Sequence, residues 1–369
     1  MADKKKSDPT ASRYLPTMTQ DYSRISDTAR AVESIVLPKI ISYIRGIAPR
    51  IAHMHSEKPF MMADYGADDG VNSSELFEKI ITQIRAVNPS LKIKLLYVDI
   101  ADRAGFDKFW ETSRLAQMEG VDAEYIRRSF YEPFPEIAGK LDIGFSSTSL
   151  HWLDTKTVKA GFFQHPFCIQ ANQLAGKERR KFVEKWRGDW RVFFRECSVE
   201  LVDGGALFLA NLTDLGHDCW PASAGYNNIR NVCSELYQEG RISKEELNAI
   251  FVPDYFATPQ EMKSLLNEND IKQALSLKSS EEMTVPCAYF TKWQDKLDDA
   301  QERSLLAATL AHVVRAWSSS SVGIGLAPGN KGQIEEIYSR LKDKFYETPV
   351  GLPYQYCLLE LVKRGKSTE

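Results

Sequence analysis

The stretch FMMADYGADDGVNSSEL, residues 60–76, decides the fold. An apolar run reaches Asp64, a cluster of glycine and acidic residues follows, and a helix-forming pattern begins after Gly70. This order predicts a strand, a tight turn and a helix, because glycine lets the backbone turn sharply and approach a ligand closely. In open α/β sheets, ligands bind at such turns, outside the carboxyl ends of the strands.

Strand and helix patterns alternate through the rest of the chain. Short apolar runs predict strands at 92–100, 141–153, 204–212, 272–279 and 356–364, and helical patterns lie at 74–87, 104–118 and 175–202. The alternation predicts a parallel sheet covered by helices on both faces. Two helical stretches, 226–266 and 297–343, are too long for simple crossovers. We expect them to cap the carboxyl edge of the sheet.

Composition narrows the class of partner. The 369 residues are 43% hydrophobic and carry a net charge of −3, which fits a globular protein without a general attraction to nucleic acid or acidic lipid. We expect no membrane span, because no apolar run reaches about 20 residues. The six cysteines are scattered without metal-ligand spacing, which is typical of free thiols in the cytoplasm. A small molecule is therefore the expected partner.

The acids in the turn select the ligand. A dinucleotide pyrophosphate would meet Asp68 and Asp69, and the spacing from Gly66 to Gly70 is not GxGxxG. S-adenosylmethionine (SAM) fits these acids better, because it carries two cationic groups, an ammonium and a sulfonium. A simpler interpretation is that one of the two acids only caps the following helix. Asp99, at the end of the second strand, is placed to accept hydrogen bonds from ribose hydroxyls. For adenine we expect apolar walls from Ile100 and Phe130 and a hydrogen bond from Ser129.

Several motifs in order resemble one family. DYGADDGVNS (64–73) keeps the Asp, both Gly and the Asn of D-L-G-C-S-S-G-x-N-T, SFYEPFP (129–135) is similar to SFYxRLFP, and SSTSLHWL (146–153) to SSYSLHWLS. These are motifs of the SABATH family, the plant carboxyl methyltransferases of salicylic, benzoic, jasmonic and indole-acetic acids and the caffeine-pathway N-methyltransferases. The resemblance is strong over residues 60–270 and weaker beyond them.

The resemblance implies an α/β fold, a Rossmann-like seven-stranded methyltransferase sheet with a helical cap inserted after the fifth and sixth strands. Residues 1–12 have no apolar pattern and carry a lysine run, which predicts a disordered tail. For the rest of the chain we expect a SAM-binding core of 13–215, 270–296 and 344–369, and a substrate-binding cap of 216–269 and 297–343. The family implies a homodimer that uses SAM and releases S-adenosylhomocysteine (SAH). The sequence offers no ligand set for Mg²⁺ or another metal.

The resemblance also implies roles for single residues. The donor side would be formed by Tyr22, Asp64, Gly66, Asn72, Asp99, Ile100, Ser129, Phe130, Ser146 and Ser147. His151 and Trp152 would face the acceptor and act in catalysis.

Departures from the family pattern bear on the substrate. Ile25 and Ala29 replace an Asn and the Gln that helps to hold the substrate carboxylate. Tyr226 stands near a common cap Trp, and we expect it to contact the substrate. Arg230 and Arg315 are candidates for binding a second anionic end of the substrate, since a guanidinium matches a carboxylate. The prediction is methylation of a small acid, with an aliphatic dicarboxylate as the finer hypothesis. The alternatives are N- or O-methylation of a heterocycle or phenol, a non-catalytic donor-binding protein and, less compatible with the acidic turn, a nicotinamide-dependent oxidoreductase.

Overall fold

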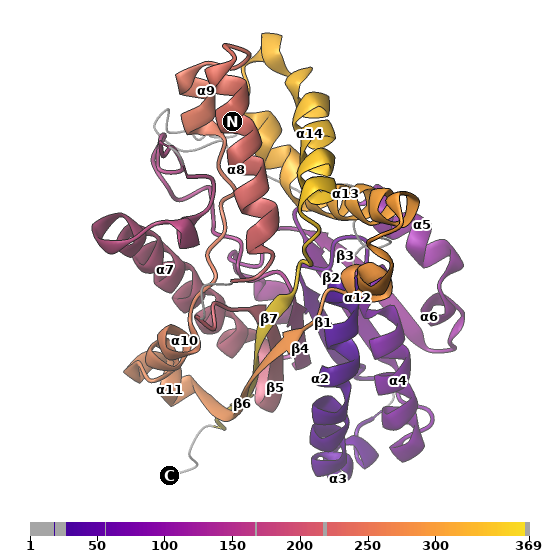
Figure 1. Ribbon diagram of the computed structural model, residues 1–369. Coiled ribbons are helices and arrows are strands. Elements are labelled where there is room, and N and C mark those ends of the chain that lie inside the picture. Colours follow the sequence, from indigo (N-terminus) through magenta and orange to yellow (C-terminus); the bar gives the residue numbers. More distant parts are fainter. Residues whose placement is uncertain (1–17, 19–26, 56, 167, 217–219, 366–369) are drawn as a thin grey trace, which may run out of the picture.

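One seven-stranded sheet forms the centre of the molecule (Figure 1). The computed structural model describes residues 18, 27–55, 57–166, 168–216 and 220–365. The strands lie in the order β3-β2-β1-β4-β5-β7-β6. Their bounds are β1 Phe60–Tyr65, β2 Ile93–Asp99, β3 Val121–Arg127, β4 Leu141–Ser147, β5 Leu201–Leu212, β6 Leu275–Val285 and β7 Tyr354–Lys363.

Six of the seven strands run in the same direction, and β7 runs in the opposite one. β1 pairs in parallel with β2 and β4, β2 with β3, and β4 with β5, whereas β7 runs antiparallel to both β5 and β6. The predicted seven-stranded α/β sheet is therefore confirmed, but the prediction of a purely parallel sheet is wrong. The central strands are almost wholly buried, as continuous apolar runs require when helices cover both faces.

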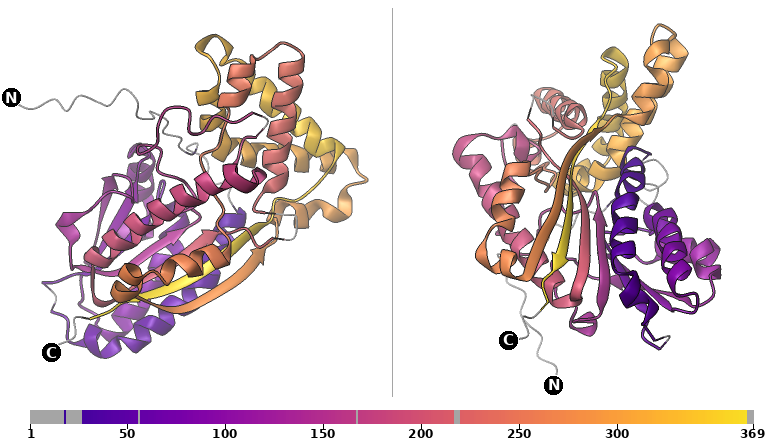
Figure 2. Two further views of the ribbon diagram at one scale, coloured as in Figure 1. Left: turned by 90° about the vertical axis from the view of Figure 1, so that its left-hand side faces the viewer. Right: turned by 90° about the horizontal axis from the view of Figure 1, so that it is seen from below.

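Helices cover the two faces of the sheet (Figure 2). On one face lie α2 Asp27–Gly46 and α4 Val71–Val87, which contact each other, and on the other lies α7 Gly176–Glu200. The remaining helices are α3 Ala48–Ala52, α5 Ala104–Thr112, α6 Arg114–Gln117, α8 Ser223–Gln238, α9 Lys244–Ala249, α10 Pro259–Leu266, α11 Asn269–Ala274, α12 Ala288–Trp293, α13 Ala300–Gly325 and α14 Gln333–Glu347, with short 3-10 turns at Pro135–Ile137, Ala171–Gln173, Gln294–Lys296 and Pro328–Asn330. Among the described helices, none combines the length and the apolar character needed to cross a membrane.

Four helices form a separate layer at one end of the sheet (Figure 1). α8 and α9, from the connection after β5, pack with α13 and α14, from the connection between β6 and β7. This layer lies where the sequence predicts a cap. However, α10 lies against the α7 face, where Met262 and Leu265 share a core cluster with Trp186 and Trp190. The range 216–269 proposed for the cap thus includes one helix that covers the sheet.

Candidate functional site

A cavity of about 140 Å³ opens where the carboxyl ends of β1, β2 and β4 meet. Of the ten predicted donor-site residues, eight line it: Asp64, Gly66, Asn72, Asp99, Ile100, Ser129, Phe130 and Ser147. They come from four separate segments, and the parallel register brings these segments to one edge. Tyr22 lies outside the described residues.

The turn after β1 has a conformation that only glycine adopts without strain. Gly66 has φ +85°, and a Cβ at this position would overlap the Cβ and Oγ of Ser149. The amide N–H groups of Gly66 and Ala67 donate to the Val98 carbonyl at 2.8 and 3.2 Å, which ties the turn to the end of β2. Asp69 accepts a 3.0 Å hydrogen bond from the Val71 amide at the start of α4. Of the two acids, Asp69 is therefore the one that contacts the first turn of the helix, although the N-cap residue itself is Gly70.

Asp99 connects the two loops beside the cavity. Its Oδ2 accepts a 2.9 Å hydrogen bond from the Asp68 amide, and its Oδ1 accepts one of 2.8 Å from the Ala101 amide. Burial raises the pKa of Asp99, while these backbone donors oppose the shift. The carboxylate has further lone pairs, so it is able to accept ribose hydroxyls as well.

Asp64 and Asn72 present polar groups to the same cavity. Burial, together with the neighbouring Asp99 carboxylate, raises the pKa of Asp64 to about 7. The Oδ1 of Asn72, in the first turn of α4, is buried without a hydrogen-bond partner among the described residues. A buried acceptor without a partner costs stability. A ligand that donates to Asn72 would remove this cost, and the SAM ammonium is such a donor.

The two serines at the end of β4 have different surroundings. Ser147 lines the cavity, but Ser146 is buried behind it and donates a 2.7 Å hydrogen bond to the Tyr65 carbonyl. Unlike Ser147, Ser146 therefore does not line the cavity, because alternate residues of a strand point to opposite faces. The next residue, Thr148, has φ +55°, which is rare for a β-branched side chain. Its Oγ1 lies 2.9 Å from the Tyr356 hydroxyl.

A second cavity of about 20 Å³ adjoins the first, and Met18, Thr148 and Trp152 line both. His151 and Tyr226, two of the predicted acceptor residues, also line the smaller cavity. Burial lowers the pKa of His151 to about 3, so its imidazole is neutral at physiological pH. Its Nδ1 has no hydrogen-bond partner among the described residues. The predicted pair His151–Trp152 therefore lies at the junction of the two cavities.

Asp254 lies behind this junction, and no pattern in the sequence points to it. It is fully buried, accepts a hydrogen bond from the Tyr226 hydroxyl, and forms an isolated antiparallel bridge with Trp152. The adjacent Tyr255 amide donates to the His151 carbonyl at 2.9 Å, and the Leu153 amide donates to the Pro253 carbonyl at 2.9 Å. This segment thus fastens the His151–Trp152 loop to the cap helix α8.

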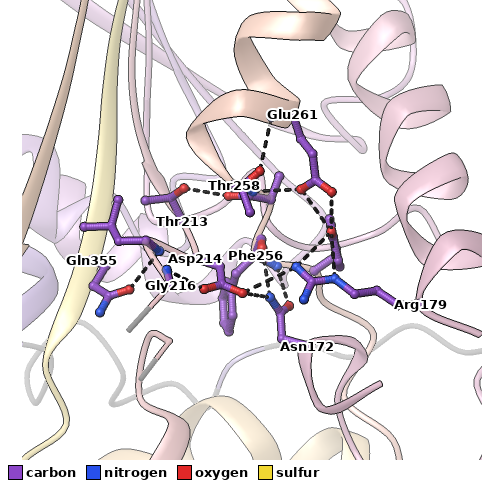
Figure 3. Close-up of polar contacts among 12 residues, drawn as sticks. Asn172, Arg179, Thr213, Asp214, Gly216, Phe256, Thr258, Glu261 and Gln355 are labelled. Atoms are coloured by element: carbon purple, nitrogen blue, oxygen red, sulfur yellow. Dashed lines mark hydrogen bonds and ion pairs between the residues drawn. The ribbon is translucent and has the colours of Figure 1, made fainter. Parts of the chain in front are cut away.

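A polar network holds the same segment from its outer side (Figure 3). Asn172 donates to Asp214 at 3.0 Å and to the Phe256 carbonyl at 2.9 Å, and accepts from the Phe256 amide at 2.9 Å. Arg179 lies 3.4 Å from Asp214, and its guanidinium stands over the Tyr255 ring. Phe256 lines the smaller cavity, so the network fixes part of its wall.

The two predicted substrate arginines line neither cavity. Arg315 forms an ion pair with Glu335, with Nη1 2.8 Å from Oε2, and its guanidinium stands over the Tyr338 ring. Arg230 is half-buried on α8. α13 thus presents Arg315 to α14 instead of the cavity, and the prediction of a guanidinium for a second substrate anion stays a prediction. In the part of the chain that is described, no group of three or more His, Cys, Asp or Glu side chains is placed to hold a metal.

Comparison with known proteins agrees with this geometry. A profile of the family described as SAM dependent carboxyl methyltransferase matches residues 17–349. Methyltransferase FUS9 of Gibberella fujikuroi is 26% identical over 258 residues, 64% of this chain and 64% of that protein. Jasmonate O-methyltransferase of Arabidopsis thaliana is 24% identical over 241 residues, 56% of this chain and 61% of that protein. The chain thus matches less than two thirds of the length of these relatives.

One solved structure is similar over the whole chain. A loganic acid methyltransferase with SAH has a TM-score of 0.69 and 16% identity, and the match covers 98% of this chain and 100% of that one. At this identity the likeness concerns the fold, and it confirms the predicted methyltransferase sheet.

Proposed function

The chain belongs to the family of SAM-dependent carboxyl methyltransferases, and we propose that it transfers the methyl group of SAM to the carboxylate of a small acid, giving a methyl ester. The observation that carries the proposal is the junction of two cavities at Thr148 and Trp152. The larger cavity holds the groups suited to a nucleoside with an amino-acid chain. The smaller one is lined mainly by apolar and aromatic side chains, which suits the organic part of an acid.

The residues of the larger cavity fit SAM. Asp99 would hold the ribose hydroxyls, Asp64 and Asn72 the methionine part, and Ser129 and Phe130 the adenosine. When bound, SAM supplies an electrophilic methyl carbon on a positively charged sulfur. Gly66 lets the turn approach the ligand closely, since any side chain there would meet Ser149.

The acceptor needs little chemical activation. A carboxylic acid with a pKa near ~4 is ionised at neutral pH, so its oxygen attacks without a general base. The task of the protein is then to position the two ligands and exclude water, which recovers up to about 7–11 kcal/mol of the barrier. The indole N–H of Trp152 is suited to hold the second carboxylate oxygen, and neutral His151 adds no charge that would draw water in.

The lining of the smaller cavity bears on the acid itself. Its described residues include Trp152, Tyr226, Phe256, Trp317 and Tyr354 and contain no Lys or Arg. The finer hypothesis of an aliphatic dicarboxylate requires a cation for the second carboxylate. We therefore propose a monocarboxylic acid with an apolar body as the preferred substrate, and keep the dicarboxylate as the case to be tested against it.

The experiment is turnover with SAM labelled in its methyl group, on matched acids that differ by one carboxylate. We expect base-labile methyl products from monoacids, with a kcat/KM at least about tenfold above that of the matched diacids. Base-stable products would instead indicate N-methylation of a heterocycle. Binding of SAM without turnover of any acid would favour a non-catalytic protein.

A homodimer in the cytoplasm belongs to the same proposal. The sequence resemblance supports the homodimer, and the five described cysteines, which are free and buried, support the cytoplasm.

A further inference from the structure

We propose that Asp68 makes the donor cavity select SAM over SAH by charge, so that the spent product is held less tightly than the donor. This inference rests on the proposed function and deepens it by naming a residue that sets the specificity of the donor site. SAM and SAH share the adenosine and the amino-acid chain. They differ by one methyl group and by the positive charge of the sulfonium, so charge is a means of telling them apart.

The lining of the donor cavity is strongly acidic. Its charged members are five carboxylates and one amine: Glu33, Asp64, Asp68, Asp99, Asp154 and Lys156. The amine of Lys156 is 2.6 Å from the Glu132 carboxylate, which balances its charge. Attraction to a cation is stronger in a partly enclosed cavity than in water, because the effective dielectric constant is lower there. The cavity as a whole therefore favours a positively charged ligand.

Among these acids, Asp68 is distinguished by a carboxylate oxygen that has no hydrogen-bond partner among the described residues. Its amide donates to the Asp99 Oδ2 at 2.9 Å, and its backbone is held at φ +50°, which is uncommon outside glycine. The oxygen without a partner is its Oδ2, which is enclosed. By contrast, Asp99 accepts two backbone N–H groups. A strained backbone that holds an acid without a partner at a cavity wall suggests a functional constraint.

The acids near Asp68 make the binding of SAM depend on pH, because they change the pKa of Asp68. Asp99 at the end of β2, Asp69 in the turn and the Tyr125 phenol on β3 face Asp68, and none of them is a cation. Burial, then Asp99 and Asp69, raise the pKa of Asp68 to about 8. A bound sulfonium favours the ionised carboxylate, so SAM binding below pH 8 releases a proton. Uncharged sulfur in SAH does not have this effect.

Isothermal titration calorimetry of the full chain with SAM and with SAH tests the proposal. The wild type should bind SAM more tightly than SAH. Asp68→Asn should lower the ratio of the SAH dissociation constant to the SAM dissociation constant about tenfold, mainly by weakening the binding of SAM. Asp69→Asn is the matched control, because it removes the adjacent charge at a residue that does not line the cavity. The Oδ1 of an asparagine is still able to accept the hydrogen bond from the Val71 amide. The control should change the ratio less than about threefold.

A second measurement uses the wild type alone and so does not depend on how a variant folds. Titrations at pH 7 in buffers of different ionisation enthalpy count the protons released, and SAM should release more than SAH. An equal loss of affinity for both ligands in Asp68→Asn, or an equal proton count in the wild type, would overturn the inference. If neither ligand binds, the proposed function fails as well, so the two failures are distinguishable.

Discussion

Replacing Gly66 with alanine tests the geometry on which the donor cavity depends. Two costs are expected. Alanine at φ +85° is strained by about 1–2 kcal/mol, as for any L-residue in the left-handed region. In addition, the new Cβ would overlap the Cβ and Oγ of Ser149 and lie 3.4 Å from the Phe130 ring. Overpacking of this kind adds about 1–3 kcal/mol, so the free energy of unfolding should fall by about 2–5 kcal/mol.

Gly161 provides a matched control, because it separates the two costs. Its φ is +83°, almost the same, but the nearest atom to an added Cβ is the Gln164 Oε1 at 3.7 Å. Gly161→Ala should therefore show the backbone cost alone, about 1–2 kcal/mol. Chemical denaturation of both variants gives the difference. Since the Gly66 turn lines the donor cavity, only Gly66→Ala should also weaken SAM binding, by at least about tenfold.

A double substitution identifies the atoms responsible. Ser149→Gly removes both overlapping atoms, so adding Gly66→Ala to that background should cost no more than Gly161→Ala does. The comparison is made with Ser149→Gly alone, because that change also removes the 3.0 Å hydrogen bond from Ser149 to the Gly66 carbonyl. Equal destabilisation by Gly66→Ala and Gly161→Ala, with unchanged SAM affinity, would refute the steric reasoning.

Three further outcomes are expected. Asp99→Asn should weaken SAM binding about tenfold in calorimetry, because an amide nitrogen would face one of the two backbone N–H groups that the carboxylate accepts; an unchanged affinity would contradict this. Trp152 lines both cavities, but its indole N–H is assigned to the acid; Trp152→Phe should therefore lower kcat/KM for the acid about 10–100-fold while the SAM dissociation constant changes less than about twofold, and a parallel loss of SAM binding would contradict this assignment. The ligand-free protein should lose stability as the pH rises from about 4 to about 7, by up to about 1.4 kcal/mol per pH unit for each group, and the slope should fade above pH 7. The reason is that the pKa values of Asp64 and Asp254 are raised to about 7 in the folded state, which holds protons there that the unfolded chain has already lost. Urea denaturation measures this slope, Asp254→Asn should reduce it, and a slope of the opposite sign would show that the buried acids are ionised throughout.

The sequence predicts the first half of the fold better than the second. Glycine, acids and apolar runs have direct local meaning, so β1, β2 and β4 with their loops, and hence Asp64, Gly66 and Asp99, could be located. β3 was missed because VDAEYIR carries exposed acidic side chains at an edge of the sheet, where no continuous apolar run is required. The antiparallel direction of β7 was missed because strand direction depends on the path of the chain through the cap, which no local pattern encodes.

The acceptor side was harder to predict for a similar reason. His151 and Trp152 were found through a motif. Asp254 acts through its bridge to Trp152, about a hundred residues earlier in the chain. Thr148 acts through Tyr356, about two hundred residues away on β7, and through its backbone angle. Neither role is visible in the residue types. Arg315 shows a related difficulty. The sequence of a helix does not show which of its charged side chains faces a cavity. Arg315 faces the next helix, where it pairs with Glu335.

The shared wall of Thr148, Trp152 and Met18 has a consequence for inhibitor design. The two cavities adjoin and share these wall residues, so one compound is able to occupy both. A bisubstrate molecule, an adenosine head joined through a short tether to an apolar acid, would gain the affinity of both halves while losing rigid-body freedom only once. The tether that binds best would measure the distance between the ligands in the two cavities.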